Sequence, residues 1–185
     1  MLIRLAQLFA IAVSASVVLH ADSFTFFATT TDRSTFNRPY DNGTSGPPAY
    51  LSAIGTAVKY VSQSFLVSSS GTYTISSTAT TPANWDNFII LYSGSFNAAT
   101  PLANAVTLND DLNGVVGRAG FSVSLNSGIH YFLVTTGFTN TDSGTAANVI
   151  TGLGAITLSP EPGTMFMIAS GLGLLIWKKH QGGSW

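Results

Sequence analysis

The sequence predicts an all-β domain, an antiparallel β-sandwich or jelly roll, flanked by an N-terminal signal helix and a C-terminal transmembrane helix. Three observations favour this fold class. The 185 residues are 45% hydrophobic but only 8% charged. The middle of the chain consists of short runs of alternating apolar and polar residues, separated by Gly, Asn, Ser and Asp clusters. It shows no helical periodicity, and roughly six to nine strands in two packed sheets would bury its apolar faces.

The first 21 residues have the pattern of a secretory signal peptide. Arg4 is followed by an apolar stretch from Leu5 to Leu19 and then by Ala21 and the charged Asp22. This order of a cation, an apolar core and small residues is typical of a cleaved export signal. Cleavage after Ala21 and cleavage after Ala15 both remain open, as does a retained anchor helix.

The first two strands of the middle are expected to form an antiparallel hairpin. One strand runs from about Lys59 to Val67, Ser68–Gly71 makes a turn, and the second strand covers Thr72–Thr78, with Tyr73 and Ile75 on one face. The segment before them, residues 33–57, is poorer in strand residues and contains Asn-Gly and Pro-Pro turns. We expect it to be a long surface connection.

Further strands follow the same logic. Asn87–Tyr92 is apolar on both faces, which predicts a central strand that is covered on each side. Phe121–Leu125 alternates and is joined by Asn-Ser-Gly to Ile129–Val134, which predicts a second hairpin. A last strand is expected near Ala155–Leu158.

The composition excludes several classes of function. The chain has no cysteine, and residues 22–159 contain a single histidine, His130, and no glutamate. Cysteine-based zinc sites, cysteine nucleophiles and two-histidine metal motifs are therefore excluded. The same residues carry four basic and seven acidic side chains, a net charge of 4 − 7 = −3. A domain with four scattered cations lacks the basic surface that nucleic acid requires, so we expect no nucleic-acid partner.

We also expect no enzymatic activity and no catalytic residue. A serine triad would need His130 beside a serine and an aspartate. His130 instead alternates with Phe132 and Val134 on a predicted strand, which indicates a buried or half-buried structural histidine, and no Gly-x-Ser-x-Gly elbow is present. A hydrolase that uses paired aspartates is not favoured, since Asp110 and Asp111 are neighbours and would point to opposite sides of an extended strand.

One oxygen-rich loop is a candidate calcium site. Asn109, Asp110, Asp111 and Asn113 precede Gly114, and Asp86 is a candidate partner from elsewhere in the chain. Calcium prefers such hard oxygen ligands, although the loop lacks the spacing and the final glutamate of an EF-hand. The alternative is an Asx-rich turn whose side chains bond backbone amides. No other cofactor is expected.

Trp85 is a candidate glycan contact. It lies in the loop Thr81–Asp86, outside the apolar runs that hold most other aromatic residues. An exposed indole could stack on a sugar ring, whereas a buried one would pack over the end of the sheet. Both interpretations stay open from the sequence.

The C-terminal segment combines three features. Pro160, Glu161 and Pro162 precede the fourteen uncharged residues Thr164–Trp177, and Lys178 and Lys179 follow. A helix of that length is about 21 Å long at roughly 1.5 Å per residue, so it could cross the roughly 30 Å hydrocarbon core only with snorkelling lysines and local thinning of the bilayer. The terminal cations favour a cytoplasmic C-terminus, with the domain on the other side of the membrane.

These three features together resemble the PEP-CTERM sorting signal of Gram-negative bacteria. The resemblance implies an exosortase-type sorting enzyme as a partner and membrane anchoring through the C-terminal helix. It also implies delivery to the cell envelope or the extracellular polymeric matrix. The basic cluster is smaller than in that family, and residues 181–185 run past it. We therefore expect three segments: a signal peptide (1–21), a β-sandwich domain (22–159) and a sorting signal (160–185).

The middle of the chain carries a second resemblance. Blocks such as Phe36–Pro39, Gly71–Thr74, Leu91–Phe96 and Leu133–Phe138, with Asn109-Asp-Asp111 between them, resemble a β-sandwich domain of secreted PEP-CTERM proteins. That domain is similar in pattern to bacterial pre-peptidase C-terminal domains. The resemblance implies a non-catalytic module. We expect a structural or adhesive role in the envelope or matrix, with a polysaccharide-binding module of the biofilm matrix as the alternative.

Overall fold

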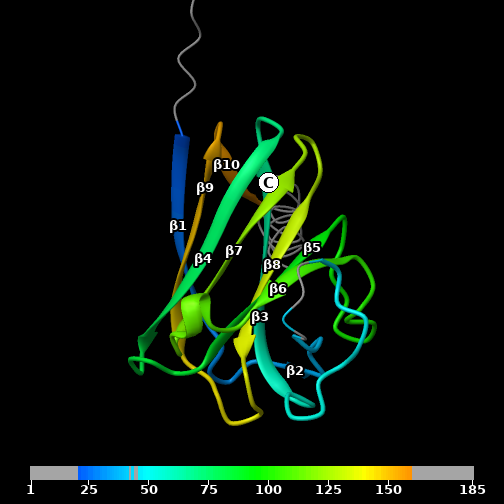
Figure 1. Cartoon of the computed structure of the whole chain (residues 1–185), viewed down its shortest axis with the longest axis vertical. Helices are drawn as coiled ribbons and strands as arrows, with labels where there is room; N and C mark the ends of the chain where they lie inside the picture. Colours follow the sequence, from blue (N-terminus) through cyan, green and yellow to red (C-terminus); the bar gives the residue numbers. More distant parts are fainter. Residues whose placement is uncertain (1–20, 42, 44–45, 160–185) are drawn as a thin grey trace, which may run out of the picture.

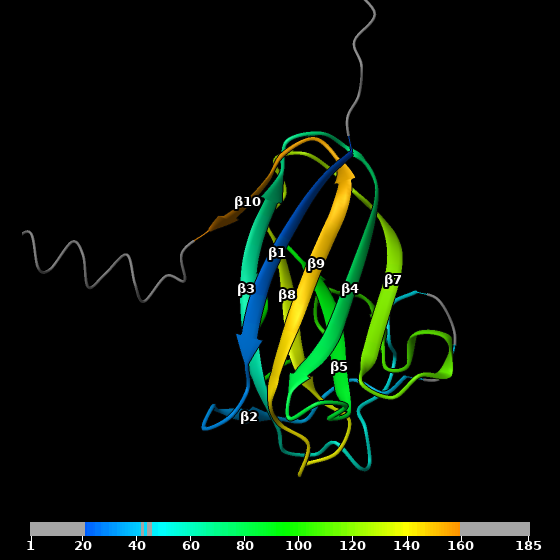
Figure 2. The same ribbon diagram turned by 90° about the vertical axis from the view of Figure 1, so that its left-hand side faces the viewer.

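Two antiparallel β-sheets packed face to face make up the part of the chain that the computed structural model describes, residues 21–41, 43 and 46–159 (Figure 1). One sheet has four strands in the order β1-β9-β4-β7: β1 (Ala21–Thr29), β9 (Thr145–Leu153), β4 (Gly71–Thr81) and β7 (Arg118–Leu125). Figure 2 shows these four strands side by side. The predicted antiparallel sandwich is confirmed.

The second sheet has the order β10-β3-β8-β5-β6: β10 (Ile156–Ser159), β3 (Val58–Val67), β8 (Tyr131–Gly137), β5 (Asn87–Ser93) and β6 (Ala105–Asn109). The two-residue β2 (Thr35–Phe36) pairs with the start of β3, and a short 3-10 turn, η1 (Leu112–Gly114), follows β6. The strands at Lys59, Thr72, Asn87, Phe121, Ile129 and Ala155 that the sequence predicts are all present, with bounds shifted by a few residues.

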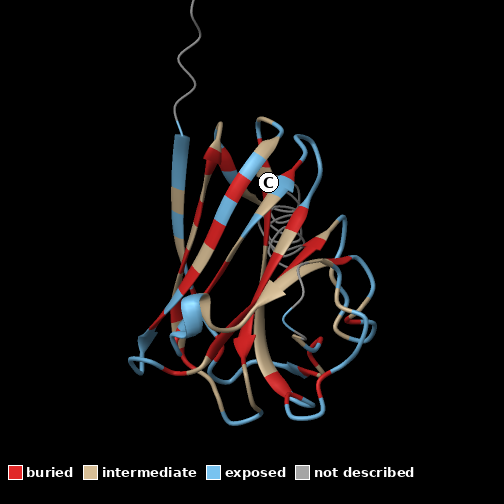
Figure 3. Cartoon of the chain, in the orientation of Figure 1, coloured by how far each residue is buried: buried red, intermediate tan, exposed pale blue. Residues whose placement is uncertain are grey.

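The main core lies between the sheets and follows the predicted alternation. On β4, Tyr73 and Ile75 are fully buried while Thr72 and Thr74 are exposed, a pattern visible along the strand in Figure 3. Tyr73 and Ile75 pack in one cluster with Phe65 of β3 and with residues of β5, β7, β8 and β9. Alternation places every second side chain on the inner face, where removal of apolar area from water stabilises the fold.

A second apolar cluster covers the face of the second sheet that points away from the main core. Phe88, Ile90 and Tyr92 of β5 belong to it, together with Phe36 of β2. The side chains of Ile89 and Leu91 point the other way, into the main core. Six of the seven β5 residues are buried for this reason, which confirms the predicted strand that is covered on both faces.

Neither predicted hairpin forms. β3 and β4 belong to different sheets, and so do β7 and β8. The short turns after Val67 and Leu125 therefore carry the chain across the core from one sheet to the other. An alternating pattern indicates which side of a strand is buried but not which strand it pairs with, so the same residues fit a hairpin and a crossing between sheets.

Residues 33–57 are more than a surface connection. They contain β2 and an isolated bridge between Pro39 and Leu51, and they bury Phe36 and Arg38. The strands β1, β6 and β9 were not predicted. Most of β1 and β9 is made of Ser, Thr, Ala and Asn, residues that the short turn-rich segments of the chain also contain.

The two predicted end segments fall outside the described residues, apart from Ala21. That residue opens β1 and is the register partner of Leu153. The proposed sorting motif at 160–162 begins directly after Ser159, the last residue of β10, and both this motif and the cations at 178–179 lie outside the described residues. Within the described ranges, no helix is both long enough and apolar enough to cross a membrane.

Candidate functional site

Three carboxylates converge at one end of the second sheet. One oxygen from each of Asp86, Asp110 and Asp111 lies within 4.8 Å of the others. Asp86 comes directly before β5, and Asp110 and Asp111 come directly after β6. Because Ile89 is the register partner of Asn109, the start of β5 lies beside the end of β6. We call these three residues the aspartate triad.

The triad is half-buried, and one oxygen of each carboxyl group lacks a hydrogen-bond partner among the described residues. In each of the three side chains, Oδ1 is shielded from solvent and has no partner among the described residues. A buried carboxylate oxygen without a partner costs free energy, because it has given up water and gained nothing in exchange. The arrangement therefore favours either a shared proton or a bound cation.

The pKa values of Asp110 and Asp86 are both raised, because these carboxyl groups are buried close to other negative charges. Burial, together with the negative charges of Asp86 and Asp111, raises the pKa of Asp110 to about 7. Burial also raises the pKa of Asp86, with Asp142 and Asp111 adding to the effect. Carboxyl groups this close cannot all be ionised at neutral pH unless positive charge lies among them.

Arg38 lies near the triad but does not neutralise it by pairing. Its side chain is 1% exposed, and its guanidinium lies 4.2 Å from the centre of the Phe88 ring and 4.8 Å from that of Phe138. Nε and Nη2 donate to the carbonyl of Phe138 at 3.0 and 2.8 Å, and Nη1 donates to the carbonyl of Pro39 at 2.9 Å. Its charge attracts Asp110 from a distance, while its hydrogen bonds within the described chain go to backbone oxygens.

The separation of the triad oxygens matches a hard cation. Calcium binds oxygen at about 2.3–2.6 Å, so two ligands of one ion lie at most about 5 Å apart. The observed limit of 4.8 Å satisfies that requirement for all three pairs. Three carboxylates would supply part of a calcium shell of roughly six to eight oxygens, with water or backbone carbonyls as the remainder.

The other two predicted ligands lie elsewhere. Asn109 Oδ1 accepts a hydrogen bond of 2.8 Å from the amide of Gly120, which ties β6 to β7. Asn113 is exposed in η1 with a φ of 58°, a left-handed conformation that asparagine tolerates. Asp111 precedes η1 without capping it through its side chain. The structure thus brings together the three aspartates of the predicted set and separates the two asparagines.

Trp85 is buried. It is 6% exposed, its indole N–H donates to the carbonyl of Thr145 at 3.0 Å, and it packs with Ala79 and Ala146. This placement corresponds to the packing interpretation. A ring enclosed in this way does not offer its face to a glycan, so the predicted glycan contact at Trp85 does not fit the described structure.

His130 is exposed in the turn before β8, not buried on a strand face, so that prediction is wrong. Its carbonyl accepts a hydrogen bond of 2.7 Å from the amide of Gly94. Within the described ranges, its imidazole forms no hydrogen bond to a serine or an aspartate. It therefore shows none of the geometry of a serine triad.

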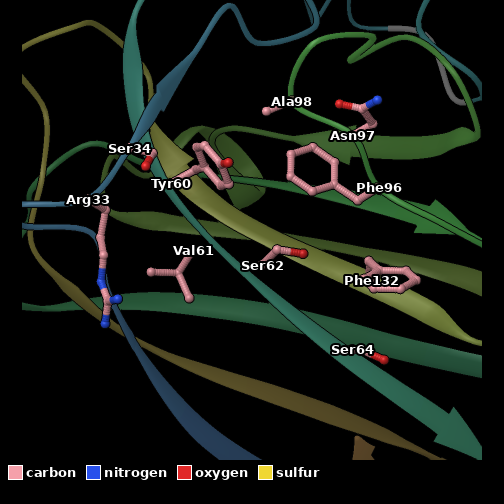
Figure 4. A pocket seen from close by; sticks show the side chains of 10 residues that line it. All are labelled: Arg33, Ser34, Tyr60, Val61, Ser62, Ser64, Phe96, Asn97, Ala98 and Phe132. Carbon is pink, nitrogen blue, oxygen red and sulfur yellow. The ribbon is translucent and has the colours of Figure 1, made fainter. Parts of the chain in front are cut away.

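A hollow of about 540 Å³ lies at the edge of the second sheet, beside β3 (Figure 4). Tyr60, Ser62 and Ser64 of β3, Phe132 of β8 and Phe96 before β6 line it, together with Arg33. Sequence reasoning missed this hollow because its lining comes from four separate segments. None of the triad residues lines it.

Comparisons with known proteins add a general likeness. No model of a known protein family matches the chain, and no curated protein matches its sequence. A family 35 carbohydrate-binding module of Abf62 from Cellvibrio japonicus has a TM-score of 0.41 and 11% identity, covering 74% of this chain and 99% of that one. A family 35 module from an environmental isolate has a TM-score of 0.40 and 13% identity, with the same coverage of 74% and 99%.

A third similar structure is PliG, a periplasmic inhibitor of g-type lysozyme from Aeromonas hydrophila. It has a TM-score of 0.36 and 7% identity, covering 80% of this chain and 93% of that one. Similarities at this level assign neither a family nor a function to the chain.

Proposed function

We propose that this chain is an exported, non-enzymatic β-sandwich that binds calcium and has a structural or adhesive role at the cell envelope or in the extracellular matrix. The observation that carries the proposal is the aspartate triad, with three shielded carboxylate oxygens that have no partner in the described chain. The export part rests on the sequence of residues 1–21 and 160–185.

A divalent cation resolves the conflict within the triad better than a proton does. One proton on Asp110 would leave two negative charges close together, whereas calcium would interact with all three carboxylates at once. Calcium is favoured over magnesium, since magnesium demands near-ideal octahedral geometry and retains its water. Extracellular modules typically bind calcium with dissociation constants of about 0.1–1 mM, which suits three ligands on a partly exposed edge.

The binding experiment is a calcium titration of the full-length chain in mild detergent, followed by calorimetry. We expect one calcium ion per chain and no measurable heat for the variant that carries Asp110→Asn and Asp111→Asn. Asp32→Asn is the matched control, because Asp32 is exposed and already has a φ of 59°, which asparagine also tolerates. Equal binding by the triad variant and the control would refute the site.

Sorting is proposed from the Pro160-Glu161-Pro162 triplet, the apolar segment after it, and Lys178 and Lys179. On this proposal the C-terminal helix anchors the exported chain until an exosortase-type enzyme processes it. Mass spectrometry of the mature protein from a host with that enzyme should show a new C-terminus upstream of Lys178. A chain that still ends at Trp185 in such a host would contradict processing.

Catalysis is not part of the proposal. The triad does not line the hollow beside β3, and His130 has no serine or aspartate partner in the described part of the chain. A general acid and its substrate must come within hydrogen-bond reach of each other, and the described structure does not bring the hollow and the carboxylates together. Polysaccharide binding remains the second candidate role, and the hollow favours it.

A further inference from the structure

We propose that the hollow beside β3 is a binding site for an acidic polysaccharide, in which aromatic rings hold sugar faces and Arg33 engages a carboxylate. This inference deepens the adhesive role proposed above. It rests on the proposed location at the cell envelope or in the matrix, where the chain would encounter such a polysaccharide. It does not depend on calcium binding.

The hollow lies where the edge of β3 is open. β2 pairs with Val58 and Lys59, and β10 pairs with residues 64–67. Tyr60 is tied to the carbonyl of Ser34, which leaves residues 61–63 as the part of this edge without a strand partner in the described chain. An added peptide strand would need a longer free edge, so this gap fits a ligand that does not bind by strand pairing.

Aromatic rings give the hollow an apolar side that the fold holds in place. Tyr60 and Phe96 lie edge to face with ring centres 5.4 Å apart, and Phe36 packs against them at 5.0 and 5.8 Å. Phe36 is buried, whereas Tyr60, Phe96 and Phe132 are only partly covered. Aromatic rings that are held by buried neighbours and remain partly exposed can stack on the C–H face of a sugar with little loss of conformational entropy.

Polar groups with unused capacity surround those rings. The side chains of Ser34, Tyr60 and Ser64 make no hydrogen bond to any described residue, and each carries a hydroxyl group that can donate and accept. Asn97 Oδ1 accepts from the amide of Ala99 at 2.9 Å, which leaves its NH₂ group free to donate. Saccharide binding requires this mixture, because each sugar presents hydroxyl groups around an apolar face.

The charge of the lining selects the ligand. Among the described residues, Arg33 is the only charged one that lines the hollow, and it is exposed. Its Nε donates to the carbonyl of Thr29 at 3.4 Å, which leaves both terminal nitrogens for a ligand. A guanidinium group binds a carboxylate through two parallel hydrogen bonds, so a uronic acid unit is the sugar that this residue would recognise.

The hollow extends around the strand edge, which indicates a chain of sugars. Figure 4 shows Phe96 and Phe132 on one side of the β3 ribbon and Arg33 with Val61 on the other side. Val61 faces opposite to Tyr60 and Ser62, as strand alternation requires. A single sugar ring would reach one group or the other, whereas an oligosaccharide can cross the edge and contact both.

The test is calorimetric titration of the full-length chain in mild detergent with short oligogalacturonates and with neutral glucan oligomers of the same length. EDTA is present, so that calcium binding by the uronates does not contribute. We expect binding of the acidic oligomer that weakens as salt is raised and binding of the neutral one that is at least tenfold weaker. No binding of the oligogalacturonate at millimolar concentration, or equal binding of the two oligomers, would overturn the proposal.

Variants distinguish the two sides of the hollow. Arg33→Gln should weaken the acidic oligomer about tenfold and leave the neutral one unchanged, while Phe96→Ala should weaken both. The matched controls are Arg118→Gln, an exposed cation at the start of β7, and Phe27→Ala, a ring that is 69% exposed on β1 of the other sheet. Both controls should bind as the parent chain does. Equal effects of Arg33→Gln and Arg118→Gln would overturn the assignment of Arg33.

The outcome can be separated from the function proposed above. Arg33→Gln should leave the calcium titration and the processed C-terminus unchanged. The triad variants should leave oligosaccharide binding in EDTA unchanged as long as they remain folded, which melting curves show. If the chain does not bind the oligogalacturonate, the proposals of calcium binding and of sorting are unaffected. If calcium binding or sorting fails, the saccharide titration still tests the hollow independently.

Discussion

Asp86 and Asp110 place carboxylate oxygens within 4.8 Å of each other, although one precedes β5 and the other follows β6. The antiparallel pairing of these two strands creates the contact, because Ile89, near the start of β5, is the register partner of Asn109, the last residue of β6. Local sequence therefore supplies two adjacent aspartates, and the sheet supplies the third.

Calcium should stabilise the folded chain. A ligand that binds only the folded state adds RT ln(1 + [L]/Kd), about 2.7 kcal/mol at a hundredfold excess over Kd. For a domain of this size the melting temperature should rise by several degrees. EDTA should reverse the rise, and Asp110→Asn with Asp111→Asn should abolish it. Melting curves that superimpose in millimolar calcium and in EDTA would contradict the prediction.

Without calcium, the stability of the domain should fall as the pH rises. The pKa of Asp110 in the folded state, about 7, lies above its ordinary value of 3.8, so the folded state holds this proton more tightly than the unfolded state does. The stabilisation is fully present below about pH 4 and is lost as the pH rises through about 7. In EDTA, the melting temperature should therefore decrease from pH 5 to pH 8.

The same ionisation should make the calcium effect grow with pH. Calcium requires deprotonated carboxylates, so its binding competes with the proton on Asp110. We expect a larger rise in melting temperature at pH 8 than at pH 5.5. A calcium-induced rise of the same size at both pH values would indicate that Asp110 is not a ligand.

Asp110→Asn should stabilise the calcium-free chain at pH 8 while weakening its calcium binding. Asparagine keeps the size of the side chain and removes a negative charge from the triad, where burial disfavours that charge. Urea unfolding in EDTA measures the effect, with Asp32→Asn as the control for loss of an exposed charge. Destabilisation by Asp110→Asn in EDTA would contradict our account of the triad.

Arg38 should be essential for stability. Removal of its guanidinium leaves the carbonyls of Phe138 and Pro39 without their donors and opens space beside Phe88. Arg38→Ala should reduce the free energy of unfolding by roughly 3 kcal/mol or more. Arg38→Lys should restore little, since an ammonium group cannot donate in the same planar geometry. Urea unfolding of both variants measures this, and full rescue by lysine would contradict the assigned contacts.

Trp85 should affect stability and leave ligand binding unchanged. Trp85→Ala should cost about 3–5 kcal/mol of unfolding free energy, because it empties a buried site. Trp85→Phe keeps much of the packing and loses the hydrogen bond to Thr145, which should cost about 1 kcal/mol beyond the lost volume. Titration of the folded Trp85→Phe variant with oligogalacturonate should match the parent chain. A large loss of affinity would place Trp85 in the binding site after all.

The part of the fold that could be predicted is the part that alternation encodes. Tyr73 and Ile75 were predictable as one buried face, and Asn87–Tyr92 as a covered strand, because burial leaves a direct mark on residue type. The strands that pair with β3 and with β7 could not be predicted. A strand that pairs with its neighbour in the sequence and one that follows a crossing to the other sheet show the same alternating pattern. β9 was missed because its buried positions hold Ala146, Asn148, Ile150 and Gly152, which do not alternate visibly with the residues between them.

The candidate site residues also include some that the sequence could predict and some that it could not. Asp110 and Asp111 stood out as a local cluster, and Asp86 could be proposed as their partner from residue type alone. The hollow could not be proposed, because Arg33, Tyr60, Phe96 and Phe132 meet only after the sheet has formed. His130 was misplaced because β8 begins one residue later, at Tyr131, and the sequence does not mark that boundary.

The most direct test of the central claim is a crystal structure of the chain grown with millimolar calcium. We predict an ion between β5 and β6, about 2.3–2.6 Å from an oxygen of each of Asp86, Asp110 and Asp111, with an anomalous signal that identifies calcium. A triad with no ion at that calcium concentration, its carboxyl oxygens instead within hydrogen-bond distance of one another, would contradict the claim.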